Sequence, residues 1–174
     1  MYLKQVIISL RPGQWIKNFF VFAALIFARK FTDGAAIEKA LAAFALFCLV
    51  SSGVYLINDV IDYEKDKRHP VKKNRPIASG KISRGLALAL AIILIVLSVS
   101  LSYVVSRELS FVFLAYALLN LFYSLYLKNV VILDVICIAV GFVLRVIAGA
   151  VAVGVVFSSW LLLCTFFLTL FLAI

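Results

Sequence analysis

Long apolar segments, separated by short charged ones, constrain the fold of this chain more than any other feature of its sequence. They cover residues 35–61, 86–105, 109–127, 130–156 and 158–174. A helix of about 20 apolar residues crosses the hydrocarbon core of a bilayer with all its backbone hydrogen bonds made internally. Since 66% of the residues are apolar and 14% charged, the sequence predicts an all-α, polytopic bundle of transmembrane helices.

A further span is expected near the N-terminus, over residues 14–31. Its apolar centre, Phe19–Ala28, is too short to cross a bilayer alone, so a spanning helix must include Lys17 and Asn18. An ionisable residue inside the membrane boundary is a candidate functional residue. The alternative is that Lys17 only extends to the lipid headgroups. We therefore expect one transmembrane domain over residues 1–174, with about six spans.

The basic residues are concentrated in one loop. Residues 62–85 hold eight of the 17 Lys and Arg residues, and the net charge of the chain is +9. Basic loops next to apolar spans are typical of the cytoplasmic side of a membrane, which explains this charge without nucleic-acid binding. We expect a multi-pass protein of the plasma (inner) membrane, with this loop and the N-terminus in the cytoplasm.

An acidic cluster lies where the segment 35–61 meets this loop. If the helix continues, Asp59, Asp62 and Asp66 fall within roughly 60° of one another, and Asn58 shares a similar face. Oxygen ligands without cysteine or paired histidine suit a hard ion such as Mg²⁺, which usually completes its coordination with water and substrate phosphates. The cluster predicts a site for Mg²⁺ and a diphosphate. The alternative is a solvated helix of mixed charge beside the membrane.

Polar residues of the later segments are expected on the same side. Tyr123 lies in the last turns of the segment 109–127 and Lys128 directly follows that segment, at the membrane face that carries the acidic cluster; Asp134 follows closely. Arg145 falls on nearly the same helical face as Asp134 but lies roughly 16 Å farther along the axis, so the two must find other partners. Arg145 forms either a buried structural contact or a substrate contact.

These residues resemble the motifs of a known family. Asn58–Asp66, followed by Arg75-Pro76, is similar to the first aspartate motif of the UbiA superfamily of intramembrane prenyltransferases. Residues 11–18, 69–80 and 133–149 resemble its decaprenyl-phosphate phosphoribosyltransferase branch. The superfamily's second aspartate motif is not found in this chain. Because the chain ends within an apolar run, we expect that it continues into further helices.

The resemblance implies a Mg²⁺-dependent transferase of cell-envelope polysaccharide precursor synthesis. Its donor would be 5-phosphoribosyl 1-diphosphate (PRPP) and its acceptor a polyprenyl phosphate. Asn58, Asp59, Asp62 and Asp66 would form the catalytic site, with the three aspartates on the metal. The substrate-binding candidates are Lys17, Asn18, Lys72, Arg75, Tyr123, Lys128, Asp134 and Arg145.

Two alternatives use the same residues differently. In the first, the protein is a UbiA-type prenyltransferase that moves a prenyl group from a polyprenyl diphosphate to an aromatic quinone precursor or haem. In the second, it is a non-catalytic membrane component or a transporter. The clustering of acids at one membrane face, rather than along a span, argues against a transporter. The oligomeric state is not predicted.

Overall fold

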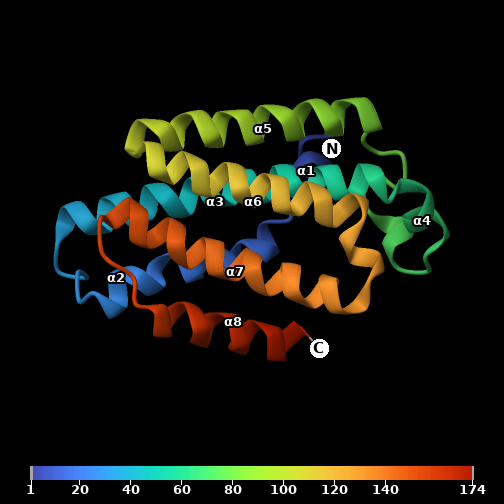
Figure 1. Ribbon diagram of the computed structural model, residues 1–174. Helices are drawn as coiled ribbons and strands as arrows, with labels where there is room; N and C mark the ends of the chain where they lie inside the picture. The colour runs from blue at the N-terminus through green and yellow to red at the C-terminus, as the bar shows by residue number, and fades with distance from the viewer. Residues whose placement is uncertain (1, 174) are drawn as a thin grey trace.

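Helices that run side by side along the length of the molecule form a bundle (Figure 1). The structure is a computed structural model, and it describes residues 2–173. The main helices are α3 (Gly34–Ile61), α5 (Arg84–Val105), α6 (Arg107–Leu125), α7 (Val131–Val153) and α8 (Ser159–Ala173). The first four of these are long and apolar enough to cross a membrane, while α8 is shorter. Residues 2–173 contain no strand, so the predicted all-α fold is confirmed.

The N-terminal segment has a different helical form. After α1 (Tyr2–Ser9), a 3₁₀ helix of 11 residues, η1 (Pro12–Phe22), leads into the short α2 (Ala23–Phe27). A 3₁₀ helix rises about 2.0 Å per residue against 1.5 Å in an α-helix, so η1 covers about 22 Å with few residues. This geometry lets the span expected over residues 14–31, whose apolar centre is short, lie across much of the bundle.

The polar loop after α3 folds back onto the helices. It contains α4 (Tyr63–Arg68) and η2 (Lys72–Asn74), and Ser83 then caps α5 by accepting a hydrogen bond from the backbone N–H of Leu86. Ile77 and Ile82 of this loop are fully buried against Leu56 of α3 and two alanines of α5. The loop is thereby fixed at one end of the bundle, where α4 lies in Figure 1.

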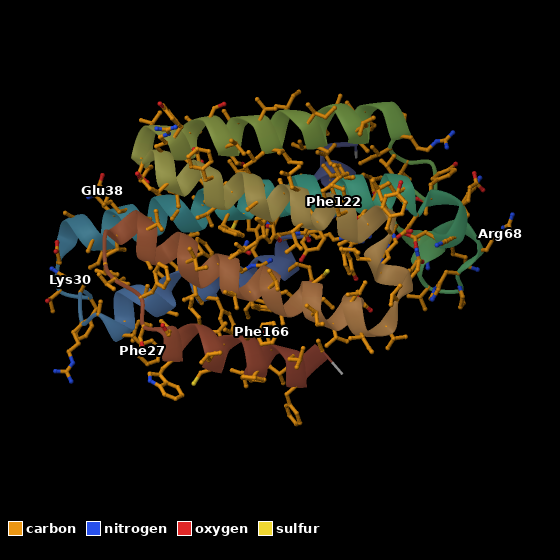
Figure 2. All side chains as sticks on the ribbon, viewed as in Figure 1. Phe27, Lys30, Glu38, Arg68, Phe122 and Phe166 are labelled. Atoms are coloured by element: carbon orange, nitrogen blue, oxygen red, sulfur yellow. The ribbon has the colours of Figure 1, made fainter. Side chains whose placement is uncertain are left out.

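Charged side chains lie at both ends of the bundle. Figure 2 shows Lys30 and Glu38 at one end and Arg68 of α4 at the other. Asp33 caps α3 at the first end, where its side chain accepts hydrogen bonds from two backbone N–H groups. At the α4 end, α6 passes into α7 through η3 (Leu127–Asn129). The polar loop and the α6–α7 junction therefore lie at the same end of the molecule (Figure 1).

The core joins η1 to α3, α6 and α7. Phe47 of α3 contacts Phe113 and Tyr116 of α6, with ring centroids 4.9 and 4.8 Å apart. Val21 of η1 is fully buried in the same cluster. A Cβ added to Gly149 of α7 would lie 1.8 Å from the carbonyl oxygen of Val21. A glycine at this position thus allows α7 to pack directly on the backbone of η1.

Gly149→Ala is therefore expected to destabilise the bundle by about 2 kcal/mol or more, because a backbone carbonyl cannot move aside as a side chain can. Unfolding of the purified protein in detergent measures the loss. Gly85→Ala in α5 is the matched control, since a Cβ there meets nothing within 4 Å. Equal stability of the two variants would show that α7 and η1 do not approach this closely.

Candidate functional site

Arg75 joins two buried aspartates, Asp59 near the end of α3 and Asp66 of α4. Its Nη1 atom lies 3.1 Å from Asp59 Oδ1 and 2.6 Å from Asp66 Oδ2. Both aspartates are 3% exposed, so each depends on a cation for charge compensation. Arg11, which precedes η1, forms a second ion pair with Asp59. Residues from four segments, the start of η1, α3, α4 and the polar loop after η2, therefore share one ion-pair network.

A second polar group lies beside this network. Asp62 directly follows α3, and its backbone N–H donates to the carbonyl of Asn58. Lys128 of η3 lies 2.6 Å from Asp62 Oδ1 and donates to Asn58 Oδ1 at 3.2 Å. The α6–α7 junction is thus tied to the end of α3, which brings Lys128 beside the acidic cluster.

The predicted three-aspartate group is divided in two. Asp62 and Asp66 line a pocket of about 440 Å³, together with Asn58, Lys72 and Lys128. Asp59 instead lines a second pocket beside Arg11 and Arg75, and Lys72 lies between the two pockets. Within residues 2–173, no group of three histidine, cysteine, aspartate or glutamate residues is close enough to hold a metal ion.

The oxygen atoms of the pocket that Asp62 and Asp66 share nevertheless suit a hard cation. Two carboxylates and one amide oxygen face a single pocket, and Mg²⁺ in proteins commonly takes one or two carboxylates with water and substrate phosphates as the other ligands. The lysines of the pocket are positively charged, so they suit the negatively charged phosphates of such a substrate. The chemistry of Asn58, Asp62 and Asp66 therefore fits Mg²⁺ when an anionic substrate is present.

A separate polar group lies inside the bundle, around Arg145 of α7. Arg145 Nε donates to Asn18 Oδ1 at 2.9 Å, Nη1 to the carbonyl of Gly141 at 2.8 Å, and Nη2 to the hydroxyl of Tyr116 at 2.8 Å. The amide nitrogen of Asn18 donates in turn to Ser51 of α3. These bonds connect η1, α3, α6 and α7 in the interior.

The remaining predicted residues lie near these groups. The hydroxyl of Tyr123 donates to Asp134 Oδ1 at 2.8 Å, which joins α6 to the first turn of α7. Lys17 is exposed on η1, and it lines a pocket of about 190 Å³ that Tyr123 and Arg145 also line. Asp134 and Arg145 have separate partners, in agreement with the distance expected between them along α7.

Sequence reasoning missed two residues that the structure places in these groups. Arg11 pairs with Asp59, and Tyr116 binds the guanidinium of Arg145. Tyr116 lies four residues before Asn120 and seven before Tyr123, so the helical spacing of these polar residues along α6 was an available signal. Arg11 begins the motif that contains Lys17 and Asn18, but no spacing rule connects it to Asp59.

Comparison with known proteins identifies the family. Residues 18–174 match the model of the UbiA prenyltransferase family. The chain belongs to this family. A UbiA homologue from Archaeoglobus fulgidus, whose structure contains DMAPP and Mg²⁺, superposes with a TM-score of 0.83. The match covers 95% of this chain and 60% of that one, at 24% sequence identity, and it confirms the UbiA fold.

Two curated relatives are more similar in sequence. The decaprenyl-phosphate phosphoribosyltransferase of Mycolicibacterium smegmatis is 40% identical over 171 residues, which are 95% of this chain and 53% of that protein. The protein of the same name from Corynebacterium glutamicum is 40% identical over 170 residues, 95% of this chain and 51% of the relative. The chain thus spans about half the length of these relatives. Because the chain belongs to the UbiA family and has helices that are long and apolar enough to cross a membrane, it is an integral membrane protein.

Replacing Arg75 by methionine is expected to destabilise the protein by about 2 kcal/mol, because Asp59 loses one of its two cations and Asp66 loses the only one described for it. Lys73→Met is the matched control, since Lys73 is an exposed residue two positions earlier in η2. Thermal unfolding in detergent compares the variants. Equal midpoints for both variants would contradict a structural role for the Arg75 ion pairs.

Proposed function

We propose that the protein carrying this chain transfers the 5-phosphoribosyl group of PRPP to a polyprenyl phosphate and releases diphosphate. The observation that supports a diphosphate donor is the pocket in which Asn58, Asp62 and Asp66 face Lys72 and Lys128. The names of the two relatives at 40% identity, both decaprenyl-phosphate phosphoribosyltransferase, support the choice of a phosphoribosyl group and a polyprenyl phosphate. Such a product would serve cell-envelope polysaccharide synthesis.

The charge distribution of this pocket suits a leaving diphosphate. Lys128 and Lys72 can each bind an anionic oxygen, and Lys128 is held towards the pocket by Asp62 and Asn58. Asn58, Asp62 and Asp66 would hold Mg²⁺, which when bound would neutralise charge that develops on the diphosphate. Asp59, between Arg11 and Arg75, would position those arginines.

The reaction places modest demands on acid–base groups. An oxygen of the acceptor phosphate would attack C1 of the ribose while the bond from C1 to the diphosphate oxygen breaks. The attacking phosphate monoester is already anionic near neutral pH, so it needs positioning more than a base. This agrees with a polar pocket whose described lining contains one histidine, His69, and no catalytic triad.

The site would open to the cytoplasm. The pocket lies at the end of the bundle that carries the basic loop, and basic loops favour the cytoplasmic side of the membrane. A cytoplasmic pocket at a plasma (inner) membrane gives a water-soluble donor direct access, while the lipid acceptor approaches from the bilayer.

The donor can be tested directly. Membranes that contain the full protein are expected to transfer radiolabel from the ribose of PRPP into the lipid fraction when polyprenyl phosphate and Mg²⁺ are added. Transfer from a labelled prenyl diphosphate to an aromatic acceptor, with none from PRPP, would instead assign a prenyltransferase. Absence of both reactions, with the protein folded, would contradict the enzymatic proposal.

Asp62→Asn is expected to lower the rate of this transfer by about 100-fold or more, because it removes a carboxylate that faces the diphosphate pocket. Glu64→Gln is the matched control, since Glu64 is an exposed acid of α4 outside the pocket lining. Initial rates at saturating Mg²⁺ compare the two. Retention of the full rate by Asp62→Asn would eliminate Asp62 as a metal ligand.

A further inference from the structure

His69 lies between α4 and η2, where it takes the place of a capping residue. Its backbone is extended, with φ −82° and ψ 133°, and its carbonyl oxygen accepts from the backbone N–H of Lys73 at 3.2 Å. Its Nδ1 atom accepts hydrogen bonds from the backbone N–H groups of Val71 and Lys72, at 3.2 and 3.3 Å. Pro70 follows at the position where proline is favoured in a helical turn. The imidazole thus does for this turn what an N-cap side chain does for a helix.

These contacts determine which ring nitrogen of His69 carries the proton. A nitrogen that accepts from two N–H groups presents its lone pair to them, so Nδ1 is unprotonated. In a neutral imidazole the proton is then on Nε2, which becomes a hydrogen-bond donor. A protonated nitrogen has no lone pair for a metal ion or for proton abstraction. In this tautomer His69 is therefore neither a metal ligand nor a general base, and what it offers is one N–H group.

The Nε2–H group is open to a ligand. Among the hydrogen bonds within residues 2–173, those of the His69 side chain all involve Nδ1. His69 lines the pocket of about 440 Å³ that Asp62 and Asp66 share. Both of these aspartates already have a cation, Lys128 for Asp62 and Arg75 for Asp66. The Nε2–H donor is thus available to an anion that enters the pocket.

The type of side chain argues for a second role beyond the cap. Asparagine, aspartate, serine and threonine are the usual capping residues, and each has an oxygen that accepts from backbone N–H groups. An aspartate at this position would add negative charge to a pocket suited to an anion. A histidine keeps the cap and adds a neutral donor on the other side of a rigid ring. Lys72, whose backbone N–H it holds, supplies positive charge to the same pocket.

We propose that His69 binds the diphosphate in this pocket through Nε2–H, while Nδ1 holds the turn that carries Lys72. The inference rests on the proposed function for the identity of this anion as the leaving diphosphate of the donor. The hydrogen bond would strengthen as the bond from ribose C1 to the diphosphate oxygen breaks, because negative charge then collects on the diphosphate. No proton is transferred, so His69 acts as a binding residue in one tautomer.

Binding of inorganic diphosphate with Mg²⁺ to the full protein in lipid nanodiscs tests the inference. His69→Asn removes the ring but keeps the cap, since the side-chain oxygen of asparagine can accept from the same backbone N–H groups. Diphosphate is expected to bind about tenfold more weakly or worse, through loss of a hydrogen bond to a charged group. Limited trypsin cleavage after Lys72 and Lys73 reports the order of the turn, and it should stay at the wild-type rate.

His69→Gln is the matched variant, because it makes the opposite exchange. The amide nitrogen of glutamine reaches the position of Nε2 and keeps a donor there, whereas glutamine is not among the favoured capping residues. This variant is expected to bind diphosphate more tightly than His69→Asn does, although trypsin cleaves its turn faster. A histidine that served only as a cap would give the reverse order of affinities.

Two results overturn the inference. Wild-type affinity for diphosphate in His69→Asn leaves His69 as a cap alone. Weaker binding by His69→Gln than by His69→Asn, in step with faster cleavage, assigns the effect to the order of the turn and not to the Nε2–H group.

The proposed function is judged by a different measurement, the transfer of ribose from PRPP by the wild-type protein. Transfer by the wild type, together with undiminished diphosphate binding by His69→Asn, contradicts the inference alone. Diphosphate binding that depends on the Nε2–H group, in a protein that transfers no ribose from PRPP, supports the inference and contradicts the proposed function.

Discussion

The ion pairs of Arg75 with Asp59 and Asp66 are the interaction on which the rest of the site depends. Two carboxylates that are almost fully buried would be strongly disfavoured without a cation between them, and Arg75 supplies it from the middle of the polar loop, directly after η2. The loop is thereby held over the end of α3, with Ile77 and Ile82 buried beneath it. The walls of both polar pockets at this end are fixed as a consequence.

A second constraint comes from polar groups within the bundle. In a membrane, apolar side chains gain little from leaving lipid for protein, so close backbone packing and hydrogen bonds between helices supply specificity. Here Gly149 lets α7 approach η1, and Asn18 and Arg145 then meet across that contact. The position of the Arg145 guanidinium, and of the pocket beside it, follows from this packing.

The helices and the general location of the site could be predicted from the sequence, but the grouping of side chains could not. Apolar length predicted the main helices, because a bilayer allows few alternatives. The acidic spacing indicated a ridge, but α3 ends at Ile61, just before Asp62, and Asp59 lines a different pocket from the one that Asp62 and Asp66 share. Arg11 was missed, because its partner Asp59 lies 48 residues away in sequence.

The sequence by itself determined an all-helical membrane protein with an acidic cluster and a basic loop at one end, since apolar length and charge position are local properties of the chain. Only the tertiary structure decided which cation compensates which acid, and which cation is left without one. Those outcomes depend on the neighbours of each helix, because a buried charge is stabilised only by groups within a few ångströms of it. Lys128 thus pairs with Asp62, whereas Arg145 has only neutral partners among the described residues.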